Sequence, residues 1–327
     1  MGKKTGLEKE VLRLRWKRRL IGTTKHWGLA SKIAVYGLLI LFSFVYLYPL
    51  LHMLAQSLMS TADLMDTSAN WIPTDVSGEN YEKAIIVMDY WMSLLRNIYL
   101  AVVPTLCQTF ICSIVGYGFA RYNFPLKKFF MGLLLLSYLL PVQAVSMPNF
   151  LLLQNLNLTD GTIKPFLVTS LLGQGVNSAL CILIFYNFHK QTPRVLLDAA
   201  QIDGAGYFRS YFRIAVPMST AAILVVVLFT FVWYWNDTNL VNLYLGGYHK
   251  DGLTTLMIRL SGFEVKYAAM EFPSITESGL LSRQKTTMND AIVMAGTMLS
   301  ILPLLIFYGV LQRYFVESVD HIGITGE

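Results

Sequence analysis

The chain has 327 residues, of which 54% are hydrophobic and only 14% are charged, and its formal net charge is +6. Soluble domains carry about 25% charged residues. The low charge, with several apolar runs of about 18 or more residues, excludes an ordinary soluble protein and predicts an all-α polytopic membrane protein. A soluble protein with apolar core helices is the alternative, but it would have too little other chain to cover them.

Residues 1–32 form a basic segment with ten Lys and Arg residues against Glu8 and Glu10. We expect a cytoplasmic tail that fixes the orientation of the chain; the alternative is a basic helix lying on anionic lipid. A nucleic-acid partner is not expected for a tail this close to a span. The apolar run that follows, from Ile33, is too long for a signal peptide and has no small-residue cleavage site, so we expect an uncleaved first span.

Six apolar runs are long enough to cross a membrane. They cover residues of about 33–54, 94–119, 129–153, 163–188, 214–235 and 291–310. The third run contains Pro141 and Pro148, and each removes a backbone donor and bends a helix. Broken backbone at membrane depth is tolerated where it is buried or lines a cavity, so the third span is expected to line one.

The loops alternate in charge from one side of the membrane to the other. Lys and Arg dominate residues 1–32, 121–128 and 189–213, whereas the 55–91 loop is acidic and the 236–288 loop is balanced. An excess of Lys and Arg marks the cytoplasmic side. The sequence therefore predicts cytoplasmic N- and C-termini, extracytoplasmic loops at 55–91 and 236–288, a six-span domain over 33–317 and a cytoplasmic tail at 318–327.

No pattern of residues indicates bond chemistry. Cys107, Cys112 and Cys181 all fall in apolar runs and are expected to be small buried hydrophobes, and no metal-ligand spacing occurs. No glycine-rich phosphate loop and no nucleophile–base arrangement is present, so we expect neither a catalytic site nor a bound cofactor. Uphill transport would then draw its energy from another chain or an ion gradient, and the near absence of ionisable residues from the spans disfavours ion coupling.

Neutral polar and aromatic residues occur within or at the ends of several spans. Together they are candidates for the path of an uncharged, hydroxyl-rich solute; the alternatives are hydrogen bonds between helices and, for the tryptophan, an anchor at the membrane interface. The candidates for the path are Gln143, Asn149, Gln174, Asn177, Trp233 and Asn236.

A polar stretch at 197–217 separates the fourth and fifth runs. Residues from Arg194 to about Arg209 can form a short helix that Gly204 and Gly206 allow to break. Small residues would let another protein approach, so this helix either docks a partner or lies on the inner leaflet. Its candidate contact residues are Asp198, Ala199, Ala200, Asp203, Gly204, Ala205, Ile214 and Pro217.

This stretch resembles the EAA motif of ABC-importer permeases, with Asp198-Ala199-Ala200, Gly204 and Ile214-Ala215-Val216-Pro217 at the spacing of that motif. Asp198 stands for the usual Glu and Val216 for the usual Leu. Three further segments resemble the maltose-type carbohydrate branch of the family. They are residues 110–124, Trp235-Asn236-Asp237 and Gln312-Arg313-Tyr314-Phe315-Val316.

The resemblance implies a type I importer permease in the bacterial cell membrane, with a cytoplasmic coupling helix between spans 4 and 5. It also implies a second homologous permease as heterodimer partner, two ATPase subunits that hold ATP and magnesium, and an extracytoplasmic solute-binding protein. The expected solute is an oligosaccharide. A peptide, an osmolyte or another polar solute is the alternative within the family, and a channel or sensor without an ATPase, or a membrane-embedded enzyme, is the alternative outside it.

Overall fold

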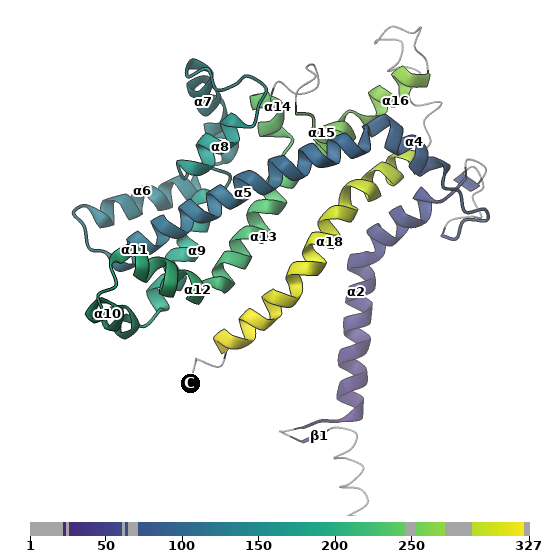
Figure 1. Ribbon diagram of the computed structural model, residues 1–327. Helices are drawn as coiled ribbons and strands as arrows, with labels where there is room; N and C mark the ends of the chain where they lie inside the picture. Colours follow the sequence, from purple (N-terminus) through teal and green to yellow (C-terminus); the bar gives the residue numbers. More distant parts are fainter. Residues whose placement is uncertain are drawn as a thin grey trace, which may run out of the picture. The chain divides into compact units, whose positions relative to one another are not determined.

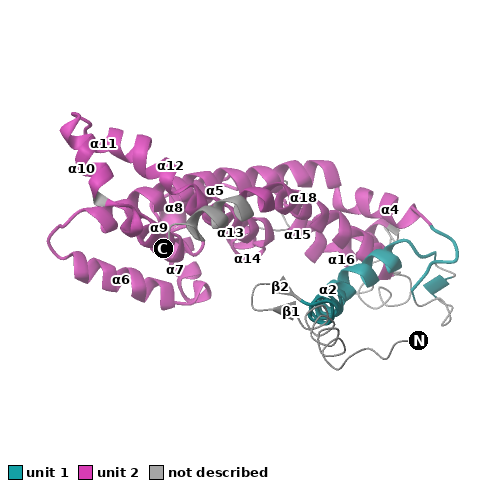
Figure 2. Ribbon diagram, turned by 90° about the horizontal axis from the view of Figure 1, so that it is seen from below, with its two compact units in different colours: residues 1–76 teal, residues 77–327 magenta. Residues whose placement is uncertain are grey.

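The computed structural model describes residues 22–23, 26–60, 63–64, 71–245, 253–271 and 290–323, and within these ranges the side chains of 22–27, Arg194, Glu271 and 315–323 are not described. The Gly-Tyr-His-Lys-Asp-Gly stretch at 247–252, whose composition predicts a turn, and most of the basic tail lie outside these ranges. The chain divides into two compact units, residues 1–76 and 77–327, which we describe separately (Figure 2).

The first unit is built on one apolar helix. Two short strands, β1 (Gly22–Thr23) and β2 (His26–Trp27), pair antiparallel and precede α2 (Leu29–Ser57). Large apolar side chains are exposed along most of α2, and Ile40 and Tyr46 are the most exposed of them, at 69% and 80%. A helix that is apolar all round belongs in a membrane or a large core. Its 29 residues are enough to cross a bilayer.

The second unit is all helical in its described residues. Its long helix α5 lies along α9 and α13, and α18 lies along α4 and α13 (Figure 1). The helices are α4 (Glu79–Met88), α5 (Tyr90–Arg121), α6 (Lys127–Leu139), α7 (Val142–Asn155), α8 (Lys164–Leu171), α9 (Ser178–Gln191), α10 (Arg194–Ile202), α11 (Tyr207–Ser210), the π-helical turn η1 (Tyr211–Ala215), α12 (Val216–Met218), α13 (Thr220–Asn236), α14 (Asn239–Leu245), α15 (Leu256–Ser261), α16 (Phe263–Glu271) and α18 (Asp290–Gly323).

Close approach of α5 and α9 depends on a glycine. A Cβ atom added at Gly116 would lie 2.6 Å from the Cβ of Phe185 and 2.9 Å from the backbone nitrogen of Tyr186. A Cβ added at Gly118, two residues on, would meet nothing within 4 Å. Small residues at such contacts let membrane helices pack backbone to backbone.

The third predicted span is broken, as its prolines indicate. The helix pair α6 and α7 bends by 105° at Leu140 and Pro141. Leu140 is extended, with ψ of 128°, because the ring of a following proline disfavours the helical conformation. Pro148 lies inside α7.

The fourth predicted span is also interrupted, which its apolar run did not indicate. Residues 172–177 separate α8 from α9, and Gly173 and Asn177 in this segment have positive φ angles of 71° and 51°. A residue in this conformation cannot continue a right-handed helix, so α8 and α9 remain two pieces.

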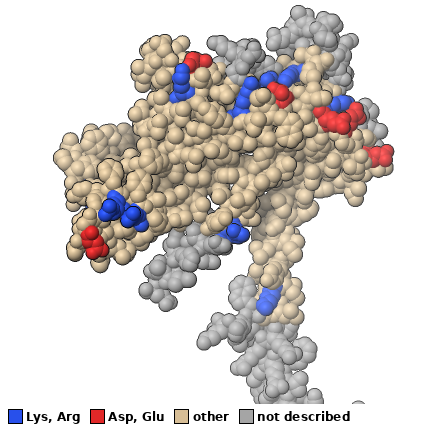
Figure 3. Space-filling view, viewed as in Figure 1, with Lys and Arg blue, Asp and Glu red and all other residues tan. Residues whose placement is uncertain are grey.

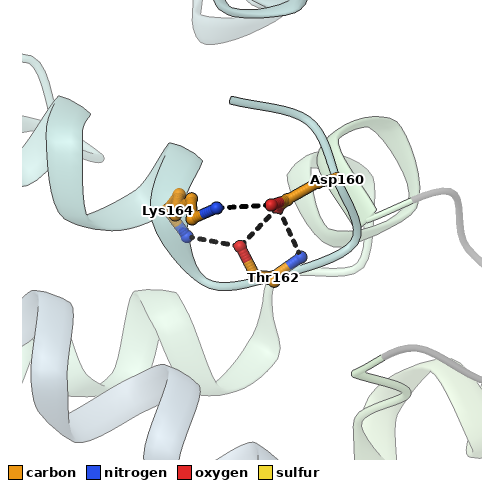
Figure 4. A network of polar contacts seen from close by, with 3 residues as sticks. All are labelled: Asp160, Thr162 and Lys164. Atoms are coloured by element: carbon orange, nitrogen blue, oxygen red, sulfur yellow. Dashed lines mark hydrogen bonds and ion pairs between the residues drawn. The ribbon is translucent and has the colours of Figure 1, made fainter. Parts of the chain in front are cut away.

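The link from α7 to α8 is fixed by polar contacts (Figure 4). The Asp160 carboxylate accepts hydrogen bonds from the backbone N–H and the hydroxyl of Thr162, and it forms an ion pair with Lys164. The backbone N–H of Lys164 donates to the Thr162 hydroxyl at 3.4 Å. These bonds close the turn through Gly161, whose φ is 81°, and start α8.

Among the described residues, three helices are long and apolar enough to cross a membrane: Leu29–Ser57, Tyr90–Arg121 and the Asp290–Tyr314 part of α18. Two bent pairs pass the same test together, namely α6 with α7 and the 207–218 segment with α13, the second bent by 76°. In residues 77–327, the face in Figure 3 carries its charged side chains near the helix ends and leaves an uncharged band between them. This pattern is that of a helical membrane protein.

Candidate functional site

A cavity of 280 Å³ lies where the two interrupted helix pairs meet. The end of α6 and the start of α7 form one wall, and the whole 172–177 segment with the start of α9 forms another. Leu240 and Tyr244 of α14 and Val115 of α5 complete it. The cavity is therefore built from the two places where backbone leaves the helical conformation, as expected for irregular backbone at membrane depth.

The lining of the cavity mixes apolar and polar groups, and its described residues carry no charge. No Asp, Glu, His, Lys or Arg of the described residues lines it. Serine hydroxyls in the wall donate to backbone carbonyls, as Ser137 does to Leu134 at 2.8 Å and Ser178 to Gly175 at 2.9 Å, so each keeps its oxygen as an acceptor. The side-chain amides of Asn149 and Gln174 form no hydrogen bond within the described part of the chain. These groups can donate to and accept from the hydroxyls of a neutral ligand.

Three of the six residues predicted to form a path line this cavity: Asn149, Gln174 and Asn177. Gln143 is exposed on α7 outside the lining. Trp233 stacks on Phe229 with ring centroids 5.8 Å apart and lies outside the lining as well.

Asn236 is the third predicted path residue outside the cavity, and it belongs to the Trp235-Asn236-Asp237 motif. The amide of Asn236 donates to the carbonyl of Val232 at 2.9 Å, and the side chain of Trp235 is buried rather than placed at an interface. The Asp237 carboxylate accepts from the backbone N–H of Leu240 at 2.9 Å and so fixes the first turn of α14. Burial raises the pKa of Asp237, while its backbone hydrogen bonds oppose that shift. The motif thus places α14, which carries Leu240 and Tyr244 in the cavity wall.

Several lining residues were not among the sequence candidates. Ser137, Ser146 and Ser178 line the cavity together with the backbone of residues 172–177. Two glycines, Gly173 and Gly175, interrupt an otherwise apolar run and are the signal that marks this break. The serines carry no such signal, since a serine inside an apolar helix often bonds only to the preceding turn.

The 194–218 segment, which we call the coupling region, turns sharply after α10. The backbone N–H of Ala205 donates to the carbonyl of Ala200 at 2.8 Å, and that of Gly204 donates to Gln201 at 3.0 Å. With Gly204 at a φ of 79°, these bonds form a Schellman motif, the common way for a helix to end at a glycine. Gly204 therefore occupies a conformation that other residues adopt only with strain.

The coupling region presents a mixed surface. Asp198, Ala199, Asp203, Gly204 and Pro217 are exposed, whereas Ala200, Ala205 and Ile214 are half-buried. Large apolar side chains are exposed beside them, and those of Ile202 and Phe208 are the most exposed, at 87% and 82%. Exposed apolar groups interspersed with carboxylates and alanines fit a protein contact surface.

Two hydrogen bonds attach the coupling region and its approach to α5. The Tyr211 hydroxyl donates to the Ser113 hydroxyl at 2.9 Å, and the Arg121 guanidinium donates to the carbonyl of Thr192 at 2.6 Å. A polar pocket of 190 Å³ lies between Arg121, Asp198 and Gln201. The region is thus exposed on one side and anchored to the long central helix on the other.

A family model matches residues 108–321, which include both the cavity and the coupling region. The apolar helices define a class, the helical membrane proteins, and the match defines the family. The chain belongs to the family of binding-protein-dependent transport system inner membrane components. The expected ABC-importer permease, placed in the bacterial cell membrane, is thereby confirmed.

Curated relatives align along most of the chain. The polygalacturonan/rhamnogalacturonan transport system permease protein YtcP of Bacillus subtilis (strain 168) is 26% identical over 87% of this chain and 94% of its own length. The arabinooligosaccharides transport system permease protein AraQ of the same strain is 24% identical over 90% and 96%.

A solved structure shares the fold. In the crystal structure of a bacterial ABC transporter involved in the import of the acidic polysaccharide alginate, one chain matches with a TM-score of 0.68 at 20% sequence identity. The match covers 89% of this chain and 99% of that chain. The all-helical ABC-permease fold predicted from the sequence is therefore confirmed.

Proposed function

We propose that this chain is the permease subunit that forms part of the translocation path of an ABC importer for neutral oligosaccharides. The observation that carries the substrate class is a cavity that combines hydroxyls, amides and backbone groups with apolar side chains and has no charged side chain among the described residues. A sugar presents many hydroxyls and no charge, and neutral polar groups bind such a ligand without leaving a buried charge unpaired.

The proposed topology has six spans with both termini in the cytoplasm. The spans lie in α2, α5, α6 with α7, α8 with α9, residues 214–235, and α18. The permease domain covers 33–317 between a basic tail at 1–32 and a tail at 318–327. The loops at 55–91 and 236–288, which hold α4 and α14 to α16, are extracytoplasmic, and the 189–213 loop is cytoplasmic. The Lys and Arg excess on one set of loops supports this orientation.

The proposed role of the coupling region is to dock on a separate ATPase. This chain contributes α10 and the glycine turn after it, while ATP and magnesium bind the two ATPase subunits. The other proposed partners are a homologous second permease and an extracytoplasmic solute-binding protein. Closure of the ATPase pair would move α10, and α11 to α13 would carry that motion to the cavity, giving alternating access.

Relatives support a carbohydrate but not one particular sugar. Beside the permeases above, the diacetylchitobiose uptake system permease protein NgcG of Streptomyces coelicolor is 25% identical over 285 residues. Another relative is the osmoprotective compounds uptake permease protein GgtD of Synechocystis, 26% identical over 302 residues. A small neutral osmolyte would also suit an uncharged cavity, so it is the second candidate.

Uptake by the reconstituted importer tests the proposal. Proteoliposomes with both permeases, the ATPases and the binding protein are expected to import a neutral oligosaccharide such as arabinotriose only when ATP is inside. Import of a small neutral osmolyte such as sorbitol instead would favour the second candidate. ATP-independent flux of any of these solutes would contradict an importer.

The variant Gly204→Asp tests the docking role. We expect the protein to remain in the membrane but to lose ATP-driven uptake, because the new side chain strains the turn and adds charge to the contact surface. Normal uptake together with intact co-purification of the ATPase would contradict the coupling assignment.

A further inference from the structure

Val176 lies in the cavity wall, in the non-helical segment between α8 and α9. Its backbone N–H and its carbonyl each bond to a buried side chain, one from α13 and one from α5. The amide of Gln108 on α5 donates to the Val176 carbonyl at 2.7 Å. The Val176 N–H donates to the hydroxyl of Tyr234 on α13 at 3.4 Å, and that hydroxyl donates to the Gln108 carbonyl oxygen at 2.6 Å. The three residues thus close a ring of hydrogen bonds that joins α5, α13 and the 172–177 segment.

The ring is sealed from solvent. Gln108 is fully buried and Tyr234 is 1% exposed. A buried polar group that loses its partner is costly, so each member of a closed ring holds the others in place. The neighbouring Gly175 leaves no spare room, because an added Cβ would lie 2.3 Å from the Gln108 carbonyl oxygen and 2.5 Å from the Tyr234 hydroxyl.

The ring fixes the part of the wall that carries two polar lining residues. Gln174 and Asn177 flank Gly175 and Val176 in the same short segment, and both face the cavity. The segment has no regular helical hydrogen bonding of its own at Val176, so its conformation depends on the side chains that bond it. Movement of Val176 would displace the amides that meet a ligand.

We propose that Gln108 and Tyr234 are positioning residues that set substrate affinity by holding the 172–177 segment in the cavity wall. The proposal rests on the proposed function, since it assumes that this cavity receives the imported solute. It assigns a role to two side chains that do not line the cavity themselves.

Hydrogen exchange in the complete importer tests whether the ring holds the segment, without any substrate. The variant Tyr234→Phe removes the acceptor of the Val176 N–H, and we expect exchange of that amide to rise about 10- to 100-fold. Tyr90→Phe is the matched control, because its buried hydroxyl donates to the Leu299 carbonyl at 3.2 Å in a different place. Unchanged exchange at Val176 in Tyr234→Phe would overturn the proposal.

Uptake kinetics test whether the held segment sets affinity. With radiolabelled arabinotriose and diacetylchitobiose as probes, Tyr234→Phe and Gln108→Leu are expected to raise the apparent KM about 10-fold while the maximal rate stays within about twofold. The apparent KM of the double variant should not exceed the higher of the two single-variant values, because either change opens the ring. An unchanged KM, with or without a lower maximal rate, would overturn the proposal.

If the wild-type importer takes up neither probe, that result contradicts the proposed function alone. The exchange measurement still decides whether the ring holds the 172–177 segment in the wall.

Discussion

The coupling region and the cavity wall each contain an interruption between helices: the turn after α10 in the first and the 172–177 segment in the second. The two interruptions are held in opposite ways. The turn after α10 is closed by bonds between residues at most five apart, such as Ala205 to Ala200. The 172–177 segment is closed by Gln108 and Tyr234, which are 68 and 58 residues away from Val176. A local turn can move as one body with its helix, whereas a segment bonded to two other helices keeps its place relative to them. The first arrangement suits a lever and the second suits a binding wall.

The variant that should affect the cavity wall most is Gly175→Ala. The new Cβ atom would overlap the Gln108 oxygen and the Tyr234 hydroxyl at 2.3 and 2.5 Å, so the ring must open. We expect loss of uptake and a destabilisation of about 1–3 kcal/mol, measured as a lower melting temperature of the purified importer. The control is Gly118→Ala on α5, where the added atom meets nothing within 4 Å. Equal stability of the two variants would contradict the packing described for the wall.

The coupling region should instead respond to backbone strain rather than to crowding. Gly204→Ala places a side chain at a φ of 79° and costs about 1 kcal/mol, although nothing lies within 4 Å of the new atom. Gly206 has an ordinary φ of −68°, so Gly206→Ala is the matched control. We expect reduced ATP-driven uptake for the first variant and near-normal uptake for the second. Equal uptake by both would show that the glycine turn is not part of the coupling.

Within the wall, polar groups that face the cavity should matter more than those on the same helix that do not. Asn149→Leu removes an amide from the lining and is expected to raise the apparent KM for arabinotriose by about five- to tenfold, as for the loss of one hydrogen bond. Gln143→Leu changes an exposed residue of α7 and should leave the KM unchanged. A larger effect at Gln143 would place the solute path elsewhere.

The smallest effect is expected at the α7–α8 link. Lys164 and Thr162 lower the pKa of Asp160 to about 2, below its ordinary value of 3.8. A lowered pKa in the folded state means that the stabilisation is complete above pH 3.8 and is lost as the pH falls toward 2. Asp160→Asn should therefore change the melting temperature little at pH 7 and leave the uptake profile between about pH 5 and 8 unaltered. A marked shift of that profile would indicate a role for this carboxylate in transport.

The difference between the two regions also explains what could be predicted from the sequence. The turn after α10 depends on near neighbours, so its small residues and Gly204 stand at a spacing that is visible in one stretch. The prolines of the third span likewise predict the break at Pro141. The family and the helical class followed from such local patterns and from composition.

The cavity was predicted only in part, because its wall depends on residues far apart in the chain. Asn149, Gln174 and Asn177 were found as polar residues in apolar runs, but nothing in the sequence pairs Gln108 with Tyr234 across 126 positions. The interruption at 172–177 was not predicted, because glycines such as Gly173 and Gly175 also occur inside continuous membrane helices. The helices α4 and α14 to α16 were missed for a related reason, since their burial comes from packing on other helices rather than from an apolar run. The helices α4 and α15 pack on α5 and α18, α14 packs on α7, and α16 packs on α4 and α15.

The central claim is that an uncharged cavity in this permease selects a neutral oligosaccharide for ATP-driven import. Its most direct test compares uptake of arabinotriose and trigalacturonate by proteoliposomes that contain the complete importer. We predict ATP-dependent accumulation of the neutral trisaccharide, weakened in Asn149→Leu, and no accumulation of the acidic one. Accumulation of trigalacturonate in preference to arabinotriose would contradict the account.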